Sequence, residues 1–250
     1  PDYLLKKYRL MPRQEAVHAM HFPEDMEVHK QALRRVKFEE LFYFQLKLQA
    51  LKHKEKAQRF GRKVNFDQQL MEEKIQNLPF ELTGAQQKSL DEILADMSSV
   101  YHMNRLLQGD VGSGKTVVAS LAMYAAVLSG LQAAIMVPTE ILARQHFANL
   151  QNLFPDLKIS LLVSGLKVAE RRAILESLAS GQTQMVVGTH ALIQEGVDFY
   201  DLGLVITDEQ HRFGVNQRKV LREKGQNPDV LMMTATPIPR TLAITAFGDM

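Results

Sequence analysis

A short glycine-rich loop carries the residues of this sequence that are best suited to chemistry. Residues 109–116 read GDVGSGKT and match the pattern G-x-x-x-x-G-K-[ST] at every required position. In such a loop the backbone N–H groups hold phosphate oxygens, the lysine reaches the terminal phosphates and the hydroxyl ligates Mg²⁺. A glycine-rich turn with a chance lysine is the alternative, but the apolar run before the loop and the helical pattern after it favour the phosphate site. The sequence therefore predicts a nucleoside triphosphate site at Gly109, Asp110, Val111, Gly112, Ser113, Gly114, Lys115 and Thr116.

Adjacent carboxylates follow an apolar run later in the chain. Residues 202–211 read LGLVITDEQH, so a predicted strand ends in Asp208 and Glu209. Ligands of parallel sheets lie at the carboxyl ends of strands, and both carboxylates could therefore face the nucleotide. Asp208 is suited to hold Mg²⁺, and Glu209 to orient and deprotonate an attacking water. A solvated acidic loop is the alternative. Together with Lys115, this pair predicts a catalytic set for triphosphate hydrolysis.

Two further observations narrow the class of nucleotide enzyme. No N/T-K-x-D segment, which would read guanine, follows the loop, and a small-molecule kinase does not need a water-activating carboxylate. An enzyme that converts hydrolysis into work fits better. Thr234 and Thr236 place two hydroxyls at the end of another predicted strand, where they could link the acidic segment to a neighbouring loop. A polar strand cap is the open alternative for these threonines.

Alternating strands and helices must position these residues. Helical periodicity covers 117–128, 141–153 and 169–178. Between these stretches lie short apolar runs typical of strands, at 105–107, 133–137, 159–163, 185–187, 204–207 and 230–233. This alternation is typical of a parallel sheet covered by helices on both faces. We therefore predict an α/β fold, with the strand ends carrying the candidate site.

The N-terminal third of the chain has a different character. Residues 26–60 have the apolar spacing of one long amphipathic helix that ends near Gly61, and a short helix is predicted over 66–75. Residues 78–80, Leu-Pro-Phe, then read as a linker. The sequence predicts two domains, a helical segment over 1–77 and a nucleotide-binding domain over 78–250.

Composition excludes several other classes. The net charge of +2 gives no bulk polycation, the absence of cysteine excludes disulfides and thiolate metal sites, and no apolar stretch is long enough to span a membrane. The first residues also lack the apolar core of a signal peptide. Residues 51–63 form a local basic run, with six Lys or Arg against one Glu. This run could contact a DNA backbone or simply form a solvated helix face.

Three stretches together resemble the motifs of superfamily 2 helicases, with GDVGSGKT as motif I, DEQH as motif II and TAT as motif III. The resemblance is closest to the bacterial RecG branch-migration helicases. It rests on RLLQGDVGSGKTVVA, PTEILARQH, VGTHAL, DEQHRFGVNQR and TATPIPRTLA, and upstream on LPFELTGAQQ. Two related families, the transcription-repair coupling factor and the replication-restart helicase, favour DEEH where this chain has DEQH. The resemblance covers essentially all 250 residues.

The resemblance implies roles for individual residues. Gln86 would read adenine with Phe80 stacking nearby, although Phe80 could instead be core and Gln86 a plain helix-surface residue. Thr116 and Asp208 would hold Mg²⁺. The remaining implied roles are sensing of the nucleotide state by Gln210 and His211, coupling of ATP to DNA contact by Thr234 and Thr236, and DNA-backbone contact by Thr139 and Thr189. A helix N-cap is the alternative for Thr139, a structural histidine for His211 and a packing turn for residues 212–214.

The resemblance also implies a fold and a function. The fold would be a RecA-like P-loop domain preceded by a helical segment. The activity would be ATP-dependent helicase or translocase action on branched DNA in recombination and repair, with ATP and Mg²⁺ as cofactors, in the bacterial cytoplasm. The chain would be a piece of a longer protein that supplies a second RecA-like domain and a wedge domain, and alone it would hydrolyse ATP poorly. A double-stranded DNA translocase of the coupling-factor type and a non-catalytic partner platform are the alternatives.

Overall fold

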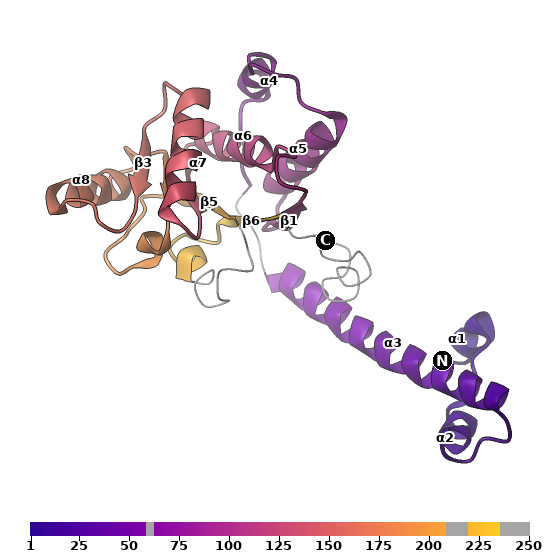
Figure 1. Ribbon diagram of the computed structural model, residues 1–250. Helices are drawn as coiled ribbons and strands as arrows, with labels where there is room; N and C mark the ends of the chain where they lie inside the picture. Colours follow the sequence, from indigo (N-terminus) through magenta and orange to yellow (C-terminus); the bar gives the residue numbers. More distant parts are fainter. Residues whose placement is uncertain (59–62, 209–219, 236–250) are drawn as a thin grey trace. The chain divides into compact units, whose positions relative to one another are not determined.

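The computed structural model describes residues 1–58, 63–208 and 220–235. The chain divides into two compact units (Figure 1). The described part of the smaller unit runs from Pro1 to Glu55, and the larger unit runs from Lys56 to Ile238. Each unit has a hydrophobic core of its own.

The smaller unit consists of helices α1 (Asp2–Tyr8), α2 (Arg13–His21) and α3 (Met26–Gln58). Its core is small and uses alanines, since Ala16 and Ala19 of α2 pack against Ala32 of α3. The structure confirms the predicted long helix, with its end at Gln58. Side chains of α3 beyond residue 50, which include most of the basic run 51–63, lie outside the described residues. The two short helices before α3 were not predicted.

A six-stranded parallel sheet forms the centre of the larger unit. Its strands are β1 (Asn104–Gln108), β2 (Gln132–Met136), β3 (Ile159–Leu162), β4 (Met185–Gly188), β5 (Leu202–Thr207) and β6 (Asp229–Thr234). Their order across the sheet is β1-β6-β5-β2-β4-β3, and every neighbouring pair is parallel. The predicted α/β class and all six predicted strands are therefore confirmed. The strand that leads into the glycine-rich loop is separated from β5 by one strand, β6.

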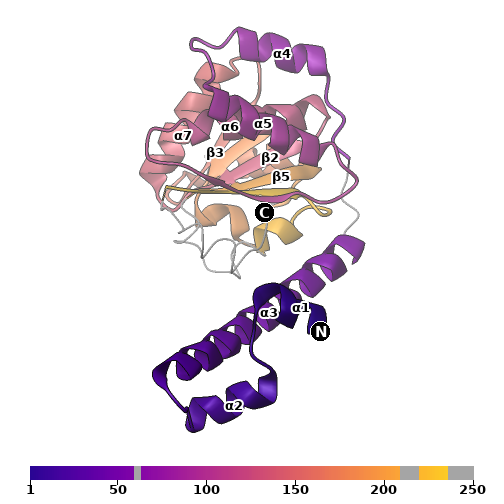
Figure 2. The ribbon, with the colours of Figure 1, turned by 90° about the vertical axis from the view of Figure 1, so that its right-hand side faces the viewer.

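Helices cover both faces of this sheet (Figure 2). The elements are α4 (Gln68–Gln76), α5 (Gly84–Met97), α6 (Lys115–Leu128), α7 (Glu140–Leu153), α8 (Val168–Ala179) and the 3₁₀ turn η1 (His190–Ile193). Alternate residues of one strand enter opposite cores, because successive strand side chains point to opposite faces. Ile135 of β2 joins the core under α5, α6 and α7, whereas Met136 joins the core with Leu178 of α8.

The start of α4 differs from the start predicted from the sequence, and the reason is its N-cap. α4 begins at Gln68 rather than residue 66 because Asp67 caps it, accepting hydrogen bonds from Gln69 N and Leu70 N. α4 packs with the larger unit through the buried Met71. The domain boundary placed at residue 77 stays a prediction, and the structure adds that the compact larger unit begins near residue 56.

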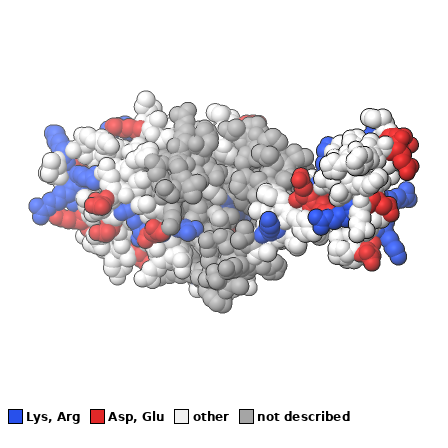
Figure 3. Space-filling model, turned by 90° about the horizontal axis from the view of Figure 1, so that it is seen from below, with Lys and Arg blue, Asp and Glu red and all other residues white. Residues whose placement is uncertain are grey.

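Charge on the described surface is mixed. In the view of Figure 3, Lys and Arg side chains lie among Asp and Glu side chains on the described surface of each unit. This distribution agrees with the net charge of +2. Among the described helices, none is long and apolar enough to cross a membrane.

Candidate nucleotide site

The glycine-rich loop leaves the carboxyl end of β1 and leads directly into α6. Gly112 has a φ of +81° and Gly114 a φ of +82°, values that L side chains rarely adopt. Gly114 is also the N-cap of α6, so the loop ends at the positive end of a 14-residue helix. Space is tight as well, since a Cβ at Gly109 would lie 2.6 Å from Ser113 Oγ. Both observations fit a backbone cradle for phosphate oxygens at the start of a helix.

Lys115 curls back over the loop that precedes it. Its Nζ donates hydrogen bonds to the carbonyl oxygens of Gly109 at 2.6 Å and Asp110 at 2.7 Å. The ammonium group therefore lies against the first two residues of the loop. Thr116 is the second residue of α6, and its carbonyl oxygen accepts a hydrogen bond from Ser120 Oγ. Lys115 and Thr116 are thus the first two residues of α6, and their predicted roles with phosphate and Mg²⁺ stay predictions.

Gln86 ties the start of α5 to the glycine-rich loop. Its Oε1 accepts a hydrogen bond from Thr83 N at 2.9 Å, and Thr83 Oγ1 accepts one from Gln86 N at 3.3 Å, which completes a capping box. Its Nε2 donates to the carbonyl oxygen of Ser113 at 2.9 Å. The side chain is therefore more than a helix-surface glutamine, because it contacts the loop across 27 residues of chain.

An ion-pair cluster links α5, the helix that carries Gln86, to β1. Arg105 of β1 donates from Nε to Asp96 at 2.5 Å and from Nη1 to Glu92 at 2.7 Å, and both carboxylates belong to α5. The hydrogen bond to Asp96 is the main cause that raises the pKa of Arg105, with Glu92 adding to it and burial opposing it. The strand that feeds the loop and the helix that carries Gln86 are thereby held together.

Asp208 lies just beyond the carboxyl end of β5, as predicted. Its Oδ2 is 3.1 Å from Nε2 of His146, which comes from α7. Both side chains are largely buried, with 7% of His146 and 18% of Asp208 exposed. The backbone N–H of Asp208 also donates to the carbonyl oxygen of Met136 at the end of β2. Sequence reasoning did not predict that His146 would contact the candidate metal ligand, and no spacing rule would have found this contact.

Thr234 connects the glycine-rich loop to the strand beside it. It is the last residue of β6, it is buried, and its carbonyl oxygen accepts a hydrogen bond from Gly109 N at 3.3 Å. Because β6 lies between β1 and β5, the strands that end in the loop and in Asp208 are about 9–10 Å apart at the usual strand spacing. The site residues therefore gather along one edge of the sheet.

The other predicted contact residues have mixed outcomes. Thr139 is the N-cap of α7 and accepts a hydrogen bond from Leu142 N at 3.3 Å, so the capping alternative is correct and leaves a backbone role open. Thr189 is buried at the carboxyl end of β4, just before η1. Phe80 is 47% exposed, which contradicts the alternative that it belongs to the core.

Several predicted positions lie outside the described residues. These are Glu209, Gln210, His211, residues 212–214 and Thr236. Among the residues that the structure describes, no group of three or more His, Asp or Glu side chains is arranged to hold a metal ion. The Mg²⁺ ligands Thr116 and Asp208 stay predictions.

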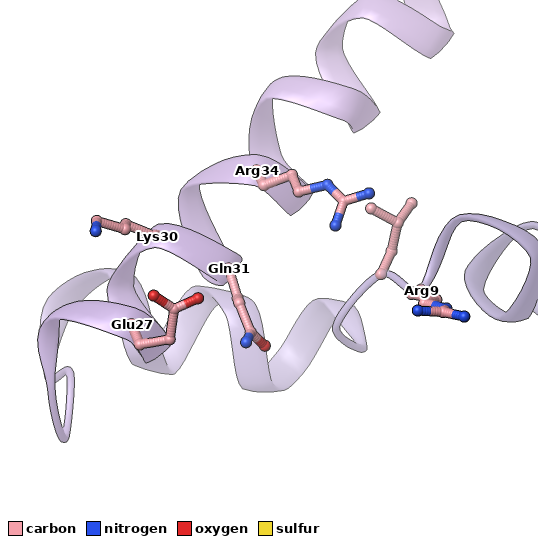
Figure 4. A pocket seen from close by; sticks show the side chains of 6 residues that line it. Arg9, Glu27, Lys30, Gln31 and Arg34 are labelled. Carbon is pink, nitrogen blue, oxygen red and sulfur yellow. The ribbon is translucent and has the colours of Figure 1, made fainter.

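A separate pocket lies in the smaller unit (Figure 4). It has a volume of about 350 Å³ and lies where α1 ends and α3 begins. Arg9, Lys30 and Arg34 line it together with Glu27, Gln31 and Leu10. Arg34 is already engaged, since its Nη2 donates to the carbonyl oxygen of Tyr8 at 3.1 Å. This pocket contains none of the predicted site residues.

Comparison with known proteins defines the class to which the fold and site belong. Residues 83–244 match the family model of DEAD/DEAH box helicases. The chain therefore belongs to the DEAD/DEAH box helicase family. Over its whole length it is 66% identical to the ATP-dependent DNA helicase RecG of Streptococcus pneumoniae serotype 4 and 58% identical to that of Bacillus subtilis strain 168. The chain spans 37% of the length of each of these relatives.

Solved structures agree with this assignment. A structure of RecG bound to a three-way DNA junction matches the whole chain with a TM-score of 0.84 and 45% identity, and the match covers 34% of that protein. A structure of Mss116p bound to single-stranded RNA and AMP-PNP matches 72% of the chain with a TM-score of 0.56 and covers 40% of that protein. At 21% identity, the second likeness bears on the fold alone. The RecA-like helicase fold expected from the sequence is thus confirmed.

Proposed function

We propose that this chain is the ATP-binding motor half of an ATP-dependent DNA helicase that acts on branched DNA. The observation that carries the proposal is the phosphate cradle at residues 109–116. Two glycines of this loop have left-handed backbone conformations, and the loop leads into α6. The full-length similarity to RecG, and the three-way junction in its matched structure, support branched DNA as the substrate. Recombination and repair in the bacterial cytoplasm are the setting that follows from these relatives.

The residues of the cradle take the roles that their positions suit. Residues 109–114 would surround the phosphates, Lys115 would neutralise the terminal phosphates, and Thr116 and Asp208 would hold Mg²⁺. Glu209 would orient the attacking water. When bound, Mg²⁺ would neutralise charge on the phosphate oxygens. Phe80 and Gln86 would contact adenine, Gln210 and His211 would sense the nucleotide, and Thr234 and Thr236 would couple it to DNA contact.

Two threonines that follow the carboxyl ends of β2 and β4 would contact DNA. Thr139 is the N-cap of α7 and Thr189 the N-cap of η1, so each lies beside backbone N–H groups that have no partner within the helix. Such N–H groups and hydroxyls suit phosphate oxygens of a DNA backbone. A second RecA-like domain and a wedge domain of the full-length protein would complete the enzyme, because this chain spans 37% of its relatives.

Steady-state ATP hydrolysis by the full-length protein tests the proposal. We expect hydrolysis to be stimulated more by a three-way junction than by linear duplex of the same length. Lys115→Ala should lower the stimulated rate about 10²–10³-fold, the range for losing one preorganised charge-stabilising donor. Lys88→Ala, at an exposed position of α5, is the matched control and should keep the rate.

Other results would favour the alternatives. Equal stimulation by junction and linear duplex would favour a double-stranded DNA translocase. No hydrolysis with any DNA, or a Lys115→Ala protein as active as wild type, would overturn the motor assignment and leave a partner platform.

A further inference from the structure

A buried histidine contacts the carboxylate to which the proposed function assigns Mg²⁺. His146 Nε2 lies 3.1 Å from Asp208 Oδ2. An ionised carboxylate only accepts hydrogen bonds, so a hydrogen bond to it requires the imidazole tautomer with a proton on Nε2. The imidazole is 7% exposed, so it cannot turn into solvent without leaving its packed position in α7. Asp208 therefore meets a donor whose own orientation is fixed.

The two residues reach each other across adjacent elements of the sheet edge. His146 comes from α7, which follows β2, and β2 pairs directly with β5. The glycine-rich loop lies on the other flank of β5, beyond β6. The hydrogen bond thus holds Oδ2 from the flank opposite the phosphate cradle. Since the carboxylate is planar, holding one oxygen sets the rotation of the whole group.

The backbone of Asp208 is held from the same flank. Its N–H donates to the carbonyl oxygen of Met136 at 3.0 Å, at the end of β2. Main chain and side chain of Asp208 are therefore both anchored to the β2–α7 unit. A metal ligand fixed in this way does not lose rotational freedom when the cation arrives, which lowers the cost of binding.

We propose that His146 is a positioning residue that orients Asp208 for Mg²⁺, an inference that rests on the proposed function. It acts through Asp208 and touches neither metal nor nucleotide. The competing explanation is purely structural, in which the pair only anchors α7 to the sheet. The two explanations differ in one measurable quantity, the Mg²⁺ concentration that nucleotide binding requires.

Variants of nearly equal volume separate the two roles in the full-length protein. His146→Gln places an amide N–H three bonds from Cβ, as Nε2 is, and so keeps the donor. His146→Leu has a similar shape and no donor. The readout is Mg²⁺ titration of the binding of a fluorescent ATP analogue, with thermal unfolding of the nucleotide-free protein measured alongside.

We expect H146L to need about 10-fold more Mg²⁺ for half-maximal binding, at the low end of the range for losing an outer-sphere partner. H146Q should stay within about 3-fold of wild type, and metal-free nucleotide binding should be unchanged in both. At a fixed, subsaturating ATP concentration, hydrolysis by H146L should fall at low Mg²⁺ and recover as Mg²⁺ is raised. If H146L does not fold, His146→Asn replaces it. The side-chain amide nitrogen of Asn is one bond closer to Cβ than Nε2 of His146 is, so it is too short to reach Asp208 Oδ2.

An unchanged Mg²⁺ midpoint in H146L, or an equal rise in H146Q and H146L, would overturn the inference. Asp208→Asn distinguishes this failure from failure of the proposed function. If D208N needs more Mg²⁺ and H146L does not, Asp208 holds the cation without help from His146. If D208N itself binds Mg²⁺ and nucleotide like wild type, the assignment of Asp208 fails, and the inference fails with it.

Discussion

Gln86 Nε2 donates a hydrogen bond to the carbonyl oxygen of Ser113 at 2.9 Å, which joins the start of α5 to the glycine-rich loop. The same amide completes the capping box with Thr83 through Oε1. One side chain therefore supports two structures at once, the first turn of a helix and the bend of a loop. Substitutions that break only one of these contacts can separate their contributions.

Gln86→Glu should weaken nucleotide binding more than it weakens the helix. A carboxylate keeps an oxygen for Thr83 N, but it sets its other oxygen against the Ser113 carbonyl, where an N–H donated before. We expect the Kd for an ATP analogue to rise about 10-fold, which corresponds to losing a hydrogen bond of roughly 1.4 kcal/mol. Thr83→Ala is the control, because it removes the cap hydroxyl and leaves Gln86 its contact with Ser113. An equal effect of both variants on the Kd, measured by fluorescence titration, would contradict this role for Gln86.

Gly114→Ala should be more harmful than Gly112→Ala, although both glycines have nearly the same left-handed φ. Each substitution adds strain of roughly 1–2 kcal/mol from the left-handed conformation. A Cβ at Gly112 would meet nothing within 4 Å, whereas a Cβ at Gly114 would collide with Gln86 Nε2. The extra cost at Gly114 is therefore displacement of Gln86. Thermal unfolding midpoints of the two nucleotide-free variants measure the difference, and equal midpoints would show that Gln86 yields without cost.

The sequence predicted the glycine-rich loop, the six strands and Asp208 at a strand end, because each rests on local spacing or on a strong apolar run. α5 was not predicted, although Thr83 and Gln86 form a recognisable capping box before its apolar positions. The contact between His146 and Asp208 could not be predicted, since the residues are 62 positions apart and meet only because β2 pairs with β5. The order of the strands depends on how helices pack on both faces of the sheet. Local sequence patterns carry no information about that packing.

Gln132 is a buried amide whose polar atoms all have partners. Its Nε2 donates to the carbonyl oxygens of Leu178 at 3.0 Å and Thr183 at 2.7 Å, and its Oε1 accepts from Asp201 N at 3.0 Å. Gln132→Leu would leave the Thr183 carbonyl oxygen and Asp201 N without this partner, whereas the Leu178 carbonyl oxygen keeps hydrogen bonds from Gly181 N and Tyr200 N. Each buried group left without a partner costs about 1–3 kcal/mol. We expect a destabilisation of roughly 2–4 kcal/mol, seen as a lower urea midpoint of the full-length protein. Gln151→Ala, at an exposed position of α7, is the control and should change the midpoint little.

The stability of the protein should depend on pH through Asp229, which lies at the amino end of β6. It begins β6 and is 4% exposed. Its Oδ1 accepts a hydrogen bond from Met103 N at 2.7 Å and lies 3.4 Å from His102 Nδ1. Burial raises the pKa of Asp229, and the nearby His102 imidazole and the hydrogen bond from Met103 N only partly offset that effect. The ionised carboxylate is therefore less favourable in the folded protein than in the unfolded chain.

The sign of the pH dependence follows from that direction. Below the unfolded-state pKa of about 3.9 the carboxyl is protonated in both states, and its ionisation costs nothing. As the pH rises through the raised folded-state pKa, stability is lost by comparison with a neutral side chain. Asp229→Asn stays neutral and keeps an acceptor for Met103 N. The difference in unfolding midpoint between D229N and wild type should therefore shift in favour of D229N from about pH 4 to pH 7.

Asp229→Ala supplies the control for this experiment. It lacks both the charge and the acceptor, so Met103 N loses its partner and D229A should be less stable than D229N by about 1–3 kcal/mol. That gap between the two neutral variants should not depend on pH, because neither side chain at position 229 titrates. A shift of D229N against wild type in the opposite direction, towards wild type as the pH rises, would mean that the pairing with His102 outweighs burial.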